Sequence, residues 1–141
     1  MEAIGAPFIR PLLVEFQREI SNLNLEGVGF RTIVHVPWDD HLLTEYGGSF
    51  QGQPTFGLQL HIYDFAEFNA AETAVALLVT MRRLFPEHMN SEVLSSGFNQ
   101  AVGNTWVAEM ILEGASIDQI MEEFQRDLDN FNEMQLRNLL Y

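Results

Sequence analysis

Two segments of the chain alternate in character from one residue to the next, and each carries hydrogen-bonding side chains on one side of that alternation. In residues 28–36 and 56–63, polar or small residues alternate with apolar ones, which is the period of a β-strand. If both strands lie in one sheet, its less apolar face carries Arg31, His35, Gln59, His61 and Tyr63. In a chain of net charge −13, that face is suited to charge-assisted hydrogen bonds with an acidic ligand or an acidic neighbouring domain. The alternative is a structural role, in which a loop covers these side chains and they satisfy its backbone.

A long irregular segment, residues 38–54, separates the two predicted strands. Its glycines and Pro54 disfavour regular structure, and loops of this length are often functional. It carries the rings of Trp38, His41, Tyr46 and Phe50. These rings either fold back onto the core or contact a ligand or another domain. We therefore add Trp38 and Tyr46 to the candidate surface.

The sequence contains no catalytic or metal-binding signature that we could identify. A phosphate-binding Gly-Lys-Ser/Thr loop, a Gly-x-Ser-x-Gly elbow and a His-Glu-x-x-His motif are all missing. Asp39, Asp40 and His41 are adjacent, but a metal site needs further ligands in fixed geometry, so we expect a solvated acidic turn. We predict no metal, no cofactor and no catalytic residue. The alternative is an independent small hydrolase with paired carboxylates, but nothing in the sequence selects a pair.

Composition limits the possible classes of protein. The 141 residues are 47% hydrophobic, which suits one domain, residues 1–141, with a substantial core. Twenty acidic residues oppose seven basic ones, all arginine, so nucleic acid and anionic membranes are poor partners. There is no cysteine, which excludes disulfides, thiolate zinc sites and a cysteine nucleophile.

The sequence shows neither a signal peptide nor a membrane span. Met1 to Pro7 lacks a basic segment followed by an apolar run, and the most apolar stretch, Ala74 to Val79, is far too short to cross a bilayer. As it stands, the chain is expected in the cytoplasm. An extracytoplasmic location would require a signal on a longer protein.

Hydrophobic periodicity predicts four helices around the two strands. Apolar residues recur at helical spacing in residues 11–22, and Pro11 suits the first turn of that helix. Residues 70–85 are apolar nearly all round, which predicts a central buried helix capped by Asn69 and Glu72. A short helix over 105–113 is expected to end at Gly114.

The last helix begins with a second capping box, formed by Ser116 and Gln119. Its apolar stripe is predicted to face the core, and its acidic face to be solvated. The stripe consists of Ile117, Ile120, Met121, Phe124, Leu128 and Phe131. Together these elements predict an α+β fold with a small sheet, helices packed mainly on one side, and a long loop between the two main strands.

An ordered series of segments resembles the C-terminal domain of the bacterial exo-β-N-acetylmuramidase family, long labelled only as a domain of unknown function. The series covers nearly the whole chain, and no single segment of it is specific. It runs through Ile4-Gly-Ala-Pro7, Leu25-Glu-Gly-Val-Gly-Phe-Arg31, Gly57-Leu-Gln-Leu-His-Ile-Tyr-Asp64, Arg82-Arg-Leu-Phe-Pro86 and Leu139-Leu-Tyr141. The chain departs from the family pattern at Ala70, where members tend to have proline. It also departs in residues 45–55, which lack the usual Lys, Cys and Gly.

The resemblance implies a two-domain enzyme of which this chain is the smaller part. Family members look like a Rossmann-like N-terminal catalytic domain joined to a C-terminal domain that closes one side of the cleft. They release N-acetylmuramic acid from the non-reducing ends of peptidoglycan fragments. Implied partners are the catalytic domain and a muramic-acid sugar. The alternative is a stand-alone interaction or oligomerisation module, such as a homodimer, without enzymatic activity.

Overall fold

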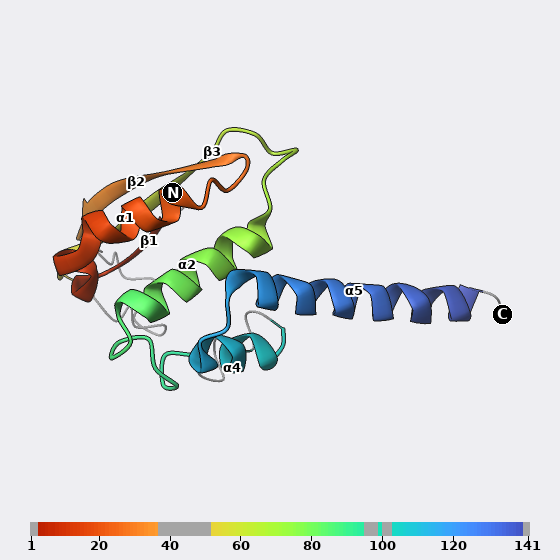
Figure 1. The fold of residues 1–141 in the computed structure, drawn as a ribbon. Helices are drawn as coiled ribbons and strands as arrows, with labels where there is room; N and C mark the ends of the chain where they lie inside the picture. The colour runs from red at the N-terminus through yellow and green to blue at the C-terminus, as the bar shows by residue number, and fades with distance from the viewer. Residues whose placement is uncertain (1–2, 37–51, 95–98, 100–102, 140–141) are drawn as a thin grey trace.

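The computed structural model describes residues 3–36, 52–94, 99 and 103–139 of the chain. It has an α+β fold in which a small antiparallel sheet packs against helices, as predicted (Figure 1). The elements, in order, are β1 (Ala3–Ala6), the 3-10 helix η1 (Pro7–Leu12), α1 (Leu13–Asn22), β2 (Val28–His35), β3 (Thr55–Ile62), α2 (Ala70–Leu84), α4 (Trp106–Glu113) and α5 (Ile117–Leu139).

The described sheet has three strands in the order β1-β3-β2, so the expectation of two strands was incomplete. The missing strand, β1, is the short run Ala-Ile-Gly-Ala, which shows no alternation of polar and apolar residues. Pairing with β3 defines it, and Gly5 lies opposite Gly57 in that register. A Cβ built on Gly57 would overlap the carbonyl oxygen of Ile4, so β1 can approach β3 this closely only because Gly57 has no side chain.

The first helical segment begins earlier than predicted and has two parts. Pro7 occupies the first turn of η1, Pro11 lies inside η1, and the α-helix begins only at Leu13. Pro7, rather than Pro11, is therefore the proline in the first turn of this helical segment. Pro11 lies before α1, where it does not remove an N–H that the α-helix interior requires. Phe16 and Ile20 on α1 are fully buried, as their helical spacing indicates.

The core lies between the helices and one face of the sheet. Leu58 at the centre of β3 is fully buried, and α2 contributes Val75, Leu77 and Met81 to the same cluster. The predicted cap of α2 is present, because Asn69 Oδ1 accepts a hydrogen bond from the backbone N–H of Glu72 at 3.1 Å. Burying each large aliphatic side chain contributes about 1.5–3 kcal/mol to stability.

The end of α4 and the start of α5 are as predicted, but the α5 stripe is only half buried. Gly114 ends α4 in the left-handed conformation, with φ 83°. Ser116 Oγ accepts from the N–H of Gln119, and Gln119 Oε1 accepts from the N–H of Ser116. Ile120 is fully buried, whereas Leu128 and Phe131 are each 52% exposed. The expectation of a core-facing stripe was therefore wrong for its second half, which extends beyond the body of the domain (Figure 1).

Among the described helices, none combines the length and apolarity needed to cross a membrane.

Candidate functional site

The strand register brings the predicted polar side chains onto one open face of the sheet. Arg31 on β2 lies opposite Gln59 on β3, and Arg31 Nε donates to Gln59 Oε1 at 2.7 Å. His61 lies opposite Gly29, and Tyr63 follows at the end of β3. The face opposite the helices therefore presents a guanidinium, an amide, an imidazole and a phenol within two neighbouring strands.

His35 is held at the far end of this face by a buried hydroxyl. Thr55, opposite His35, is only 1% exposed, and its Oγ1 donates to the backbone carbonyl of His35 at 2.9 Å. The same Oγ1 lies 3.0 Å from His35 Nδ1. Since a hydroxyl has one proton, it accepts from the ring when it donates to the carbonyl. This arrangement supports the structural alternative for His35.

His61 differs from His35. It is exposed and makes no hydrogen bond to another residue that the structure describes. The structural role considered for His61 therefore has no support from its described surroundings. Trp38 and Tyr46, the remaining two candidates, lie outside the described residues, as does the acidic run Asp39-Asp40-His41.

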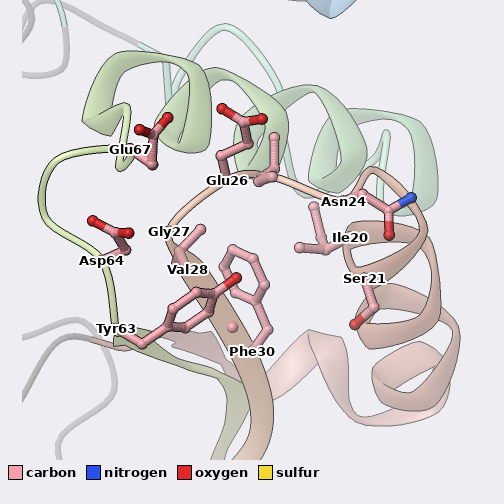
Figure 2. A pocket seen from close by; sticks show the side chains of 12 residues that line it. Ile20, Ser21, Asn24, Glu26, Gly27, Val28, Phe30, Tyr63, Asp64 and Glu67 are labelled. Carbon is pink, nitrogen blue, oxygen red and sulfur yellow. The ribbon is translucent and has the colours of Figure 1, made fainter.

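A pocket of about 490 Å³ opens where β2 begins and β3 ends (Figure 2). Tyr63 lies at its rim, with its ring Cε1 3.9 Å from the position that a Cβ of Gly29 would occupy. The pocket therefore adjoins the open face of the sheet. The turn after α1, the start of β2 and the segment after β3 contribute its lining residues, which are Ile20, Ser21, Asn24, Leu25, Glu26, Gly27, Val28, Gly29, Phe30, Tyr63, Asp64 and Glu67.

Gly27 joins the two segments that form the pocket. Its carbonyl accepts hydrogen bonds from the N–H groups of Tyr63 and Asp64, at 3.0 and 3.2 Å. Its φ is +72°, and a Cβ at this position would overlap the carbonyl oxygen of Asp64 and come 2.7 Å from the nitrogen of Phe68. Only glycine fits this close approach. The contact between Gly27 and the segment near residue 64 was not predicted from sequence.

The pocket carries three carboxylates that the sequence analysis did not select: Glu26, Asp64 and Glu67 (Figure 2). No ion pair links them to a basic side chain within the described part of the chain. Asp64 Oδ1 accepts from the N–H of Ala66 at 2.9 Å, which fixes the turn after β3. Asp64 directly follows the second predicted strand, and this position is the signal that could have identified it.

The side chains of this region can form hydrogen bonds with a polar ligand. The carboxylates of the pocket can accept from hydroxyl or ammonium groups, and they oppose an anionic group at the same place. Arg31, on the adjoining face, offers the opposite charge. In the residues described, no group of three His, Asp or Glu side chains is placed to hold a metal ion.

Three comparisons connect the chain with known proteins. The family described as "Exo-beta-N-acetylmuramidase NamZ, C-terminal" matches residues 1–141. The peptidoglycan β-N-acetylmuramidase NamZ of Bacillus subtilis (strain 168) is 32% identical over 99% of this chain and 31% of its own length. The crystal structure of a DUF1343 family protein from Bacteroides fragilis NCTC 9343 has a TM-score of 0.73 at 17% identity, covering 96% of this chain and 34% of that one.

The chain thus spans about a third of the length of both relatives. The structural match shows the same fold. The family match extends over every residue, and the B. subtilis relative supports it independently. The chain belongs to the family of C-terminal domains of the NamZ exo-β-N-acetylmuramidases.

Proposed function

We propose that this chain is the auxiliary domain of a peptidoglycan β-N-acetylmuramidase and has no hydrolytic activity of its own. Residues 1–141 form one domain that provides a wall of the substrate cleft, and a second domain supplies the catalytic groups. The whole enzyme releases N-acetylmuramic acid from the non-reducing ends of peptidoglycan fragments. One observation carries the proposal: the family match covers the whole chain, while the chain corresponds to only about a third of its muramidase relative.

The open face of the sheet supports a role in contacting the sugar. Gln59 Oε1 accepts a hydrogen bond from Arg31 Nε. No acceptor among the described residues pairs with the two terminal nitrogens of Arg31. A guanidinium held in this way can bind a carboxylate through its terminal nitrogens. Muramic acid differs from glucosamine by a carboxylate-bearing ether, so Arg31 offers a means of selecting it. His61 is a second donor on the same strand face.

The adjoining pocket supports the same role for the uncharged part of the ligand. The Tyr63 side chain is 73% exposed at the pocket rim and offers a ring face for the C–H groups of a sugar. Asp64 and Glu67 can accept from sugar hydroxyls. Their negative charge directs the sugar carboxylate away from the pocket and towards Arg31.

The proposal is tested by hydrolysis of a chromogenic N-acetylmuramide. Four samples are compared: this chain, the part of the B. subtilis relative that precedes the matched third, their mixture, and a fusion in which this chain replaces that third. We expect no hydrolysis by this chain alone and hydrolysis by the fusion or the mixture above that of the B. subtilis part alone. Hydrolysis by this chain alone would overturn the proposal, as would a fusion no more active than the B. subtilis part alone.

A second candidate is a stand-alone interaction or oligomerisation module without sugar chemistry. The exposed apolar residues on the second half of α5 favour it, because exposed apolar stripes commonly mark protein contacts. Sedimentation velocity, together with the hydrolysis assay, discriminates between the auxiliary domain and the interaction module. A symmetric dimer of this chain, with no activity in the fusion, would support the interaction module.

A further inference from the structure

The helix α5 has a packed half and an unpacked half. Ile120 is fully buried and Met121 and Phe124 are partly buried in the core cluster, whereas Leu128 and Phe131 are each 52% exposed. Met134 is 57% exposed. Figure 1 shows the second half of the helix running away from the rest of the domain, with the C-terminus at its far end.

Contacts with α4 mark where packing ends. The ring of Phe124 meets Trp106 edge to face, with the ring centroids 4.8 Å apart. Trp106 Nε1 donates to Asp127 Oδ2 at 3.2 Å. These contacts anchor α5 as far as Asp127.

The exposed residues continue the stripe that packs against the core. Phe124, Leu128 and Phe131 follow one another at spacings of four and three, so they lie along one side of the helix. Met134 extends this side by one more step of three. We refer to Leu128, Phe131 and Met134 as the distal stripe. It is the continuation, beyond Asp127, of the face that already forms the interface with the domain.

A helix of this kind normally depends on packing for its stability. In proteins most helical stability comes from packing of an amphipathic face rather than from the intrinsic propensity of the residues. The segment after Asp127 continues α5 to Leu139, and the distal stripe is its apolar face. A surface that covers the stripe is therefore expected.

We propose that the distal stripe docks onto the other domain of a muramidase, the part that precedes the matched third in the B. subtilis relative. The proposal rests on the proposed function and specifies the surface through which the auxiliary domain meets its partner. In the relatives, the region equivalent to this chain is accompanied by about twice its length of further sequence. A second copy of this chain is a poorer occupant, because each copy has a net charge of −13 and the two would repel.

The charged residues of α5 also predict the chemistry of the docking site on the partner. Asp127 and Asp129 lie beside the start of the distal stripe, and the neighbouring Arg126 is paired with Glu123. The partner should therefore offer an apolar groove bordered by basic or neutral side chains.

The test uses this chain and the separately expressed preceding part of the B. subtilis relative, with binding measured by isothermal titration calorimetry. Leu128→Glu and Phe131→Glu each place a carboxylate in the distal stripe. Leu136→Glu is the matched control, since it also replaces an exposed apolar side chain by a carboxylate, and its spacing of two residues from Met134 and five from Phe131 places it on a different side of the helix. We expect each stripe variant to weaken binding about tenfold or more. The control should change it less than about threefold.

Equal binding by the stripe and control variants would overturn the proposal, and so would absence of binding by the unmodified chain. Thermal unfolding of each variant checks the fold, and because both positions are half exposed, we expect little change. Sedimentation velocity provides a further check. A homodimer of the unmodified chain that Phe131→Glu converts to a monomer would assign the stripe to a second copy and overturn the proposal.

Hydrolysis measured on the same mixtures separates this inference from the proposed function. Binding that depends on the distal stripe, without any hydrolysis by the fusion, would support the docking surface and refute the auxiliary role. Hydrolysis and binding that are both unchanged by Phe131→Glu would refute the docking surface and leave the auxiliary role supported.

Discussion

Arg31 and Gln59 face each other across β2 and β3, and Gln59 holds the guanidinium through Nε at a distance of 2.7 Å. This pair lies on the face of the sheet opposite the core, on the same side as His61. No acceptor among the residues that the structure describes pairs with the terminal nitrogens of Arg31.

We predict that Arg31→Ala combined with His61→Ala leaves the domain folded and weakens its function. Both side chains are exposed, and surface substitutions of this kind usually change the free energy of unfolding by less than about 0.5 kcal/mol. Loss of a charge-assisted contact with a carboxylate should lower kcat/KM of the fusion for N-acetylmuramides by about tenfold or more.

The control for this prediction is Arg18→Ala, which removes another exposed arginine, one that pairs with Glu15 on α1. It should leave kcat/KM unchanged. If the Arg31/His61 variant unfolds, the two residues are structural. If it folds and is fully active, the open face does not contact the substrate.

The second prediction concerns the approach of β1 to β3 at Gly57. Gly57→Ala should destabilise the domain by about 3 kcal/mol, because the new Cβ would overlap the carbonyl oxygen of Ile4 and lie 2.5 Å from Cα of Gly5. Urea unfolding followed by circular dichroism measures the change.

Gly103→Ala is the control for this substitution. Gly103 has a φ of +83°, and apart from its chain neighbours no described residue places an atom within 4 Å of its built Cβ, so only the conformational cost of about 1 kcal/mol applies. Equal effects of the two substitutions would show that β1 does not pack against Gly57 as described.

The third prediction compares the two halves of α5. Ile120→Ala removes a fully buried side chain and should cost about 2–5 kcal/mol, the range for such core truncations. Leu128→Ala removes a side chain that is 52% exposed in this chain alone and should cost less than about 1 kcal/mol. Urea unfolding of the isolated chain measures both changes.

A large effect of Leu128→Ala in the isolated chain would contradict the division of α5. It would mean that the distal stripe is covered within this chain or by a second copy. Repeating the measurement at several protein concentrations separates these causes, because only self-association makes the midpoint depend on concentration.

The local sequence pattern was sufficient to predict most of the individual strands and helices. Alternation of side chains in β2 and β3, and helical spacing in α2 and α5, depend on periods of two and 3.6 residues that any buried face imposes. The caps at Asn69 and Ser116 were also evident, because capping depends on side chains only three residues apart. The polar open face followed from the same alternation, provided that the two strands shared a sheet.

Only the tertiary structure shows which segments of the chain are neighbours in space. β1 is a strand because β3 pairs with it across more than 50 residues, and its own four residues carry no strand period. The pocket forms because Gly27 meets Asp64 and Phe68, a contact that no local pattern reports. The boundary between the packed and unpacked halves of α5 lies at the contacts of Phe124 and Asp127 with Trp106 on α4. The sequence by itself determined which faces are apolar; the three-dimensional packing determined which of those faces this chain covers, because burial depends on contacts between segments far apart in sequence.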